Sequence, residues 1–360
     1  MRKILVLIGT DSEAIRAVPL IHCLCAIPSM QTVVCIAAQD SQMLAAELEN
    51  FGFLFDVNLE LIRQTANADM VAPGVDRVIR KHKPDFVLVY GDVSAAMASF
   101  SRQASFGNQG TGLRMYELHY HGAEGANPRT IDLAATRYFV SSETSRDNLL
   151  RDGVAYENIF ITDSTEVDAV RMVAERIRND DALNTRLAAD FSFIDPNRRL
   201  ILVNGSRHEN NDSHLESLCR ALKRLAVRAD VQVVVPLHPD SSMKEVMGEI
   251  CADFANIELI QPQDYLHSVY LMLAAYFIVT DPGNMPKEAL SLSKPVLEMP
   301  DMSGRPEAGA LNPVERDASR ILQECTMLLD DPSYYSTFSA PRNPYGDGHA
   351  SQRIVEALLR

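Results

Sequence analysis

Short runs of apolar residues alternate along the chain with longer stretches in which apolar residues recur every three to four positions. The short runs have the length of buried strands, and the longer stretches have the period of amphipathic helices. Such alternation is typical of an α/β fold, in which helices cover both faces of a parallel sheet. We therefore expect parallel strands that are connected by helices.

The expected elements fall into two halves. In the first half, the pattern predicts strands at residues 3–8, 32–37, 86–90 and 138–140, with helices at residues 12–26, 41–51, 76–82 and 142–151. In the second half, it predicts strands at residues 200–203, 231–236, 257–260, 276–280 and 295–299, with helices at residues 213–229, 242–251, 265–275 and 285–292. A polar stretch without strands, residues 178–199, is predicted to connect the halves.

The length of 360 residues is enough for two domains of ordinary size. We predict that residues 1–170 and residues 171–348 form two Rossmann-like domains. In doubly wound domains, ligands bind beyond the carboxyl ends of the strands. A central crevice between the two domains is therefore the expected ligand site.

Composition and charge narrow the range of functions. Hydrophobic residues make up 46% of the chain and charged residues 23%, as in soluble globular proteins. The net charge of −14 argues against nucleic acid as a partner. The first apolar run is too short for a signal peptide, and no run reaches the length of a membrane span. The six cysteines follow no metal-binding or disulfide spacing, so we expect a cytoplasmic protein.

Two strand ends of the first half carry candidate ligand residues. Gly9 permits a tight turn between a strand and a helix, and the helix N-terminus beyond it offers free N–H groups to an anion. Ser12 in this turn has the alternative role of a helix N-cap. Asp92 follows the strand at residues 86–90, where a carboxylate either faces the ligand site or caps the next helix.

The second half has three comparable strand ends. Residues 204–209 follow a buried strand, and Arg207 there is suited to an anion or to a surface ion pair. His238 follows the next strand and is either a ligand residue or a satisfied loop histidine. Residues 280–289 are predicted to form a turn at a helix start, where backbone N–H groups can bind a second anion. Lys287 in that helix either reaches a phosphate or is simply solvated.

Two segments carry a resemblance to a known family. Residues 343–354 read Asn-Pro-Tyr-Gly-Asp-Gly-His-Ala-Ser-Gln-Arg-Ile, and residues 9–15 read Gly-Thr-Asp-Ser-Glu-Ala-Ile. With them, the chain resembles the non-hydrolysing UDP-N-acetylglucosamine 2-epimerases. The resemblance implies a GT-B-like fold, a nucleotide sugar held between two Rossmann-like halves, and no metal or cofactor. It also implies that the last helix, residues 349–360, packs on the first domain and that the protein forms a homodimer through that domain.

The resemblance assigns chemistry to individual residues. Asp92 matches an aspartate of the family's acid–base group around the sugar, and Glu124 matches a residue of its second catalytic stretch. Two glutamates of that stretch fall on Gly110 and Gly125. Epimerisation at C2 moves a proton from one face of the sugar to the other, so it needs poised carboxylates. Glu124, or Glu117 nearby, would have to replace the missing pair.

Other matched positions also carry a changed residue. Asp11 stands where the family has an arginine for the phosphates, Ser206 replaces a histidine that assists near the leaving phosphate, and His208 replaces an arginine. Lys287 replaces a glutamate that binds the ribose, and a cation there favours a phosphate. The expected substrate-binding residues are Gly9, Asp11, Arg114, Ser206, Arg207, His238, Gly283, Asn284, Lys287, Glu288 and Arg305. The expected catalytic residues are Asp92, Glu124 and His208.

The spacing Glu117-x-His119-x-His121 would put three potential metal ligands on one face of a strand. The family that the chain resembles needs no metal, and we expect this segment to be a loop. A pair of solvated or substrate-facing histidines is therefore favoured over a metal site.

The substitutions lead to three hypotheses about function. The first is an enzyme that makes or breaks an anomeric bond with phosphate or diphosphate leaving, that is, glycosyl transfer on a sugar phosphate. The second is a conventional UDP-N-acetylglucosamine 2-epimerase that uses carboxylates from neighbouring positions. The third is a non-catalytic subunit or sensor that binds a nucleotide sugar. In each case, the partner is a small sugar phosphate or nucleotide sugar.

Overall fold

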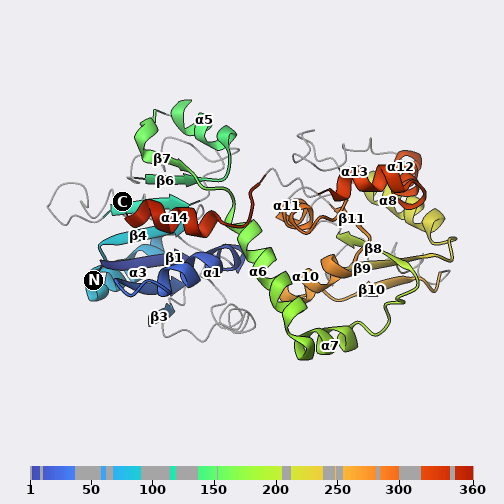
Figure 1. The fold of residues 1–360 in the computed structure, drawn as a ribbon, viewed down its shortest axis with the longest axis horizontal. Coiled ribbons are helices and arrows are strands. Elements are labelled where there is room, and N and C mark those ends of the chain that lie inside the picture. The colour runs from blue at the N-terminus through green and yellow to red at the C-terminus, as the bar shows by residue number, and fades with distance from the viewer. Residues whose placement is uncertain are drawn as a thin grey trace. The chain divides into compact units, whose positions relative to one another are not determined.

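The structure is a computed structural model of the chain. It describes residues 2–8, 11–36, 58–61, 68–90, 114–118, 137–151, 153–204, 212–237, 248, 254–280, 284–299, 318–340 and 345–359. The chain divides into two compact units, Met1–Ala169 with Tyr345–Arg360 and Val170–Pro344. Figure 1 shows the described helices and strands of both units.

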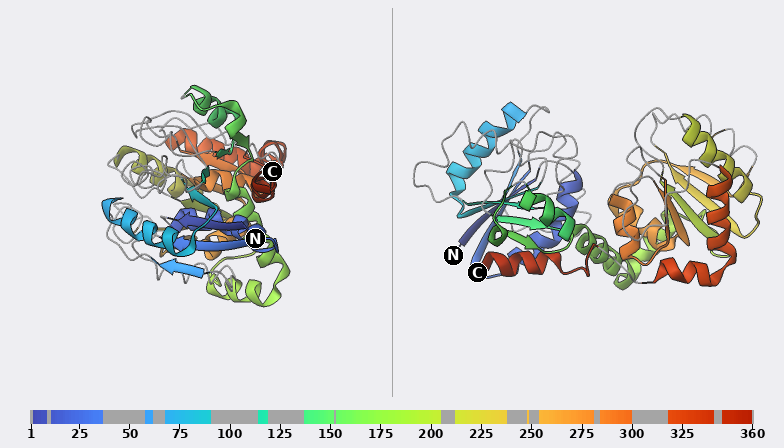
Figure 2. Two further views of the ribbon diagram at one scale, coloured as in Figure 1. Left: turned by 90° about the vertical axis from the view of Figure 1, so that its left-hand side faces the viewer. Right: turned by 90° about the horizontal axis from the view of Figure 1, so that it is seen from above.

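The first unit contains a seven-stranded parallel sheet (Figure 1). In the order of the sheet, its strands are β3 (Asn58–Leu61), β2 (Met30–Ile36), β1 (Arg2–Ile8), β4 (Phe86–Tyr90), β5 (Arg114–Leu118), β6 (Arg137–Val140) and β7 (Ile159–Ile161). Its helices include α1 (Asp11–Cys25), α3 (Ala68–His82), α5 (Glu143–Arg151), the start of α6 (Thr165–Asn179) and α14 (Ala350–Leu359). The right-hand view of Figure 2 shows α3 and α14 on opposite sides of this sheet.

The central strands of this sheet are apolar on both faces. Residues 4–8 of β1, residues 33–36 of β2 and residues 87–89 of β4 are all 0% exposed. Parallel strands that are covered by helices on both sides need continuous apolar runs rather than an alternating pattern. This requirement explains why short unbroken runs marked these strands in the sequence.

The last helix, α14, is held in the first unit by a carboxylate from α6. Asp168 is buried, and its two oxygens accept hydrogen bonds from the backbone N–H groups of Ala350 and Ser351, at 3.1 and 2.7 Å. N–H groups in the first turn of a helix have no partner within the helix, and a carboxylate there also interacts favourably with the helix dipole. Asp168 therefore serves as the cap of a helix that begins 182 residues later.

The turn before α14 requires a glycine. Gly346 has a φ of +131°, and a Cβ at this position would lie 2.4 Å from Cβ of Asp163. Asp163 itself has a φ of 66°. Its carboxylate accepts a hydrogen bond from Nη1 of Arg353 at 2.6 Å. Burial raises the pKa of the Asp163 carboxyl, and the Arg353 guanidinium opposes this rise.

Changing Gly346 to alanine is expected to lower the free energy of unfolding by about 3 kcal/mol or more, because a steric clash adds to an unfavourable backbone conformation. Gly153→Ala is the matched control, because Gly153 also has a positive φ of +90° but a Cβ there meets no atom within 4 Å. We expect the control to cost about 1 kcal/mol. Chemical denaturation measures both variants, and equal losses would show that the contact with Asp163 is unimportant.

The second unit contains a five-stranded parallel sheet. In the order of the sheet, its strands are β10 (Ile257–Ile260), β9 (Val231–Pro236), β8 (Arg199–Asn204), β11 (Phe277–Thr280) and β12 (Val296–Glu298). Besides the end of α6, its helices include α7 (Asp181–Asp190), α8 (Asp212–Leu225), α10 (Tyr265–Ala274), α11 (Asn284–Ser291), α12 (Ala318–Asp330) and α13 (Pro332–Ser339). Helices α8 and α12 pack on one face of the sheet around Leu222, Val233 and Cys325.

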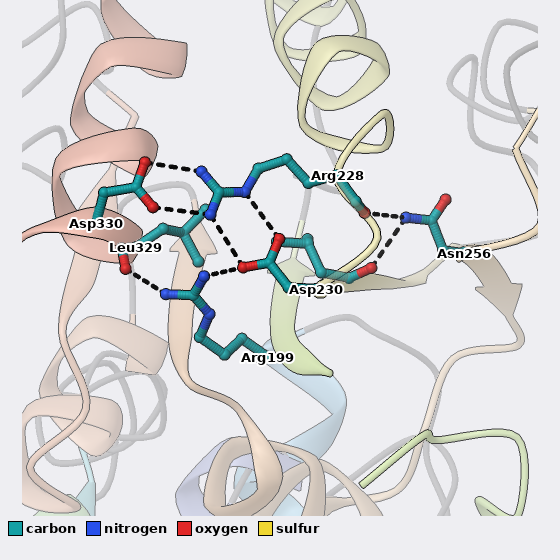
Figure 3. Close-up of polar contacts among 7 residues, drawn as sticks. Arg199, Arg228, Asp230, Asn256, Leu329 and Asp330 are labelled. Carbon is teal, nitrogen blue, oxygen red and sulfur yellow. Dashed lines mark hydrogen bonds and ion pairs between the residues drawn. The ribbon is translucent and has the colours of Figure 1, made fainter. Parts of the chain in front are cut away.

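A network of charges lies at the amino-terminal ends of β8 and β9 (Figure 3). Arg228 lies between Asp330 of α12 and Asp230, with bonds of 2.7 to 3.0 Å to the two carboxylates. Arg199 also donates to Asp230 and to the carbonyl of Leu329. The Arg228 guanidinium lowers the pKa of both carboxyls. The network ties the end of α12 to the loop before β9, so its role is structural.

The structure corrects several predicted elements. The stretch at residues 178–199 does not connect the halves, because it lies within the second unit and contains helix α7. Helix α3 begins at Ala68 rather than at residue 76. The segment at Glu117 is not a loop, because Arg114–Leu118 forms strand β5. The predicted helices at residues 41–51 and 242–251 lie outside the described residues, apart from the single helical residue 248.

Candidate functional site

The order of the first sheet reverses between β1 and β4, since the strands that follow β1 and β4 in sequence lie on opposite sides of this pair. The carboxyl ends at such a switch point are the usual ligand site of a doubly wound domain. Gly9 directly follows β1, and Asp92 comes two residues after the end of β4. Both candidates thus follow the two strands of the switch point in the chain. They lie outside the described residues, as does Glu124.

Helix α1 begins next to this switch point. Its first residue is Asp11, three positions after Ile8 ends β1. The free N–H groups of the first turn favour an anion at this place. The sequence has an aspartate at this first position, and we expect its charge to counteract that preference, so that a phosphate in the first unit would need a cation from elsewhere.

Strand β5 places two residues at opposite edges of the first sheet. Arg114 opens the strand and is in register with Phe86, the first residue of β4. Its backbone therefore lies at the amino-terminal edge, away from the carboxyl ends. Glu117 is in register with Val89, one residue before the end of β4. A carboxylate residue thus stands at the carboxyl edge, on the strand next to the one that leads to Asp92.

Three polar residues form a row at the carboxyl ends of the second sheet. Asn204 of β8 is in register with Thr280 of β11, which is in register with Glu298 of β12. Thr280 and Glu298 are each 1% exposed. The strands β8 and β11 lead into two candidate segments, residues 205–209 and 281–283. The row therefore marks the edge of the second sheet where an anion was expected.

Most of the second-unit candidates lie outside the described residues. Those that lie outside the described residues are Ser206, Arg207, His208, His238, Gly283 and Arg305. Asn284 is the first residue of α11, where the helix N-terminus follows β11 as the sequence predicted. For the second-unit site, the structure therefore gives the positions of β8, β11 and α11.

Helix α11 carries the two candidates whose side chains are described. Lys287 is half-buried, so it is not a fully solvated lysine. Glu288 is buried, and its Oε1 accepts a hydrogen bond from the hydroxyl of Tyr265 at 3.0 Å. The hydroxyl of Ser291 also donates to the carbonyl of Glu288 at 2.6 Å. The bond from Tyr265 joins α10 to α11, whereas the bond from Ser291 lies within α11.

Sequence reasoning missed three charged residues near the strand ends. They are Glu298, Arg16 of α1 and Glu166 of α6. Nε of Arg16 lies 2.8 Å from Oε1 of Glu166. No local sequence pattern predicts this ion pair, because its two residues are far apart in the chain and each lies within an ordinary helical sequence.

Metal chemistry has no support within the part of the chain that the structure describes. In that part, no group of three or more histidine, cysteine, aspartate and glutamate residues is placed to hold a metal ion. His119 and His121 lie outside it. Among the described helices, none has the length and apolar character that crossing a membrane requires.

The two units, each a parallel sheet with helices on its faces, define an α/β protein of two Rossmann-like domains. A family model described as UDP-N-acetylglucosamine 2-epimerase matches residues 24–359. The UDP-N-acetylglucosamine 2-epimerase of Escherichia coli O157:H7 is 39% identical over 368 residues, which cover 99% of this chain and 98% of that protein. The protein of the same name from Yersinia pestis is 38% identical with the same coverage. The chain belongs to the UDP-N-acetylglucosamine 2-epimerase family.

A solved structure extends the likeness to three dimensions. The UDP-GlcNAc 2-epimerase from Neisseria meningitidis, in a crystal structure bound to UDP-GlcNAc, superposes with a TM-score of 0.83 at 28% identity, over 99% of each chain. The fold is therefore GT-B-like. Both the family and the fold class that the sequence predicted are confirmed.

Proposed function

We propose that this chain is a UDP-N-acetylglucosamine 2-epimerase that has moved part of its acid–base chemistry to new positions. The observation that carries the proposal is 39% identity to an enzyme of that name over 99% of the chain. This identity favours epimerisation over glycosyl transfer on a sugar phosphate, which was the first hypothesis from the sequence. The bound UDP-GlcNAc of the Neisseria meningitidis enzyme also favours a nucleotide sugar as the ligand.

The reaction requires a proton to leave C2 on one face of the sugar and to return on the other. We assign these steps to Asp92 together with Glu117 or Glu124, since Gly110 and Gly125 have no acidic group. The position of Glu117 at the carboxyl edge of β5 supports its part in this group.

The phosphates are proposed to lie at the helix starts beyond the strand ends. Gly9 and the start of α1 would contribute backbone donors in the first unit, and Gly283, Asn284 and Lys287 would contribute donors in the second. The remaining second-unit contacts are proposed for residues that follow β8, β9 and β12 in the chain: Ser206, Arg207, His238 and Arg305. His208, which also follows β8, keeps its proposed catalytic role. The homodimer that the resemblance implies stays a prediction, and light scattering at micromolar concentration measures it.

One observation favours a second candidate function, which is glycosyl transfer on a sugar phosphate. Lys287 is half-buried and replaces a ribose-binding acceptor with a cation, as expected for a ligand that carries a phosphate there. An enzyme that cleaves or forms an anomeric bond of a sugar phosphate would use Asp92 but would not need the missing carboxylates at positions 110 and 125.

Proton–deuterium exchange at C2 of UDP-GlcNAc, followed by NMR in heavy water, tests the proposal. We expect exchange and formation of the 2-epimer, about 10²–10⁴-fold more slowly than with the Escherichia coli enzyme, because a well-placed acid or base contributes about that factor. Binding of UDP-GlcNAc without any exchange would favour the second candidate. An absence of both binding and exchange would refute the proposal.

A further inference from the structure

An ion pair with a buried carboxylate joins α1 to the first turn of α6. Nε of Arg16 lies 2.8 Å from Oε1 of Glu166, and the two side chains are 16% and 2% exposed. Glu13, which shares a helix face with Arg16, is also buried. A buried ion pair adds little stability compared with apolar residues of similar volume, because both charges lose their hydration. Stability alone therefore does not account for the pair.

Both partners belong to helices that start at the carboxyl edge of the first sheet. Helix α1 begins three residues after β1 ends, and α6 begins four residues after β7 ends. Glu166 is the second residue of α6, so the ion pair brings the guanidinium of Arg16 next to the start of that helix. Ligands of doubly wound domains bind at this edge. The pair therefore stands close to where an anionic ligand meets the first unit.

Arg16 is the one arginine or lysine of α1. The first residue of the helix is Asp11, an acidic residue. Arg16 is therefore the residue of α1 that can offer a full positive charge to a phosphate. A guanidinium forms charge-assisted hydrogen bonds with phosphate as well as with carboxylate. The carboxylate of Glu166 is thus paired with the guanidinium that a phosphate would bind.

We propose that Glu166 is an internal anion that competes with a phosphate of the ligand for Arg16. The proposal deepens the proposed function and rests on it, because it names the cation of the first unit that meets the diphosphate. A phosphate that contacts Arg16 then meets a guanidinium whose charge is already balanced by Glu166, which lowers affinity in the native chain. Glu166 acts through Arg16 and is a positioning residue.

The main test is to change Glu166 to glutamine, which keeps the shape of the side chain and removes its charge. Calorimetric titration with UDP and with inorganic diphosphate measures the effect. We expect the variant to bind both probes about tenfold more tightly than the native chain, since the phosphate no longer competes with the charge of Glu166 for Arg16. The double variant Arg16→Met/Glu166→Gln should lose this gain, because it has no guanidinium.

Asp330→Asn is the matched control. It removes a carboxylate that lies 2.7 Å from Arg228, at the amino-terminal edge of the second sheet, and should leave both affinities unchanged (Figure 3). Thermal unfolding with and without diphosphate adds a second measurement. Diphosphate should raise the Tm of Glu166→Gln more than that of the native chain, because the variant binds the anion more tightly.

The outcomes separate this proposal from the proposed function. If the native chain binds UDP and Glu166→Gln binds both probes no more tightly, the competition is refuted and the proposed function stands. If the native chain does not bind UDP, the proposed function fails. The titration with inorganic diphosphate then tests by itself whether Glu166 competes for Arg16. Tighter binding of diphosphate by Glu166→Gln then supports the competition, and no gain overturns it.

Discussion

Changing Glu117 to glutamine is expected to lower the rate of proton exchange at C2 of UDP-GlcNAc by about 10²–10⁴-fold. The proposed reaction needs acidic groups on both faces of C2, and two positions that carry them in the family are glycines here. Glu117 lies at the carboxyl edge of β5, in register with Val89 of the strand that leads to Asp92. Loss of its charge removes a base without a change of shape. NMR in heavy water, with the native chain measured alongside, gives the ratio of rates.

A matched control separates chemistry from folding. Glu60 is the last but one residue of β3, as Glu117 is of β5, but it stands at the far edge of the same sheet. Glu60→Gln should therefore leave the exchange rate unchanged. If Glu117 has taken over the role of the missing glutamates, Gly125→Glu should restore part of the rate in the Glu117→Gln background. Equal rates for Glu117→Gln and the native chain would assign the role to Glu124 instead.

The central strands were predictable because each is a short, unbroken apolar run. Strands β1, β8, β9 and β11 are buried on both faces, and the structure has each of them within a residue or two of the predicted bounds. Edge strands have no such requirement. In β7, the last residue, Ile161, is 40% exposed, so a run of only three residues gave no signal. Strand β3 at the other edge was missed in the same way, since it is four residues long and includes a glutamate.

The site was predictable as far as it depends on local sequence. A strand that is followed at once by a helix identifies a helix start at the ligand edge, and α1 and α11 begin at such places. Contacts between distant segments leave no comparable mark. The bond from Asp168 to the first turn of α14 and the pair of Arg16 with Glu166 depend on how helices pack, which periodicity does not encode. The strand at Glu117 was missed because polar and charged residues interrupt its apolar pattern.

The charge at Lys287 decides between the two candidate functions. Changing Lys287 to glutamate is expected to weaken the binding of a sugar 1-phosphate by about ten- to hundredfold, because one charge-assisted hydrogen bond to phosphate contributes roughly 1.5–3 kcal/mol. The same change restores the acceptor that the family uses for ribose, so UDP-GlcNAc should lose less affinity than the sugar phosphate. Calorimetric titration of both ligands against both proteins gives the two ratios.

Lys223→Glu is the control for the change of charge, because Lys223 is an exposed lysine of α8 in the same unit. A half-buried lysine that reaches the ligand affects one ligand more than the other, whereas a general change of charge affects both equally and weakly. One outcome is that the native chain binds the sugar phosphate more tightly than UDP-GlcNAc and that Lys287→Glu reverses this order. Lys287 then selects the ligand, and the result supports glycosyl transfer on a sugar phosphate. If Lys287→Glu leaves both affinities unchanged, the lysine does not contact the ligand, and the transferase hypothesis loses its main support.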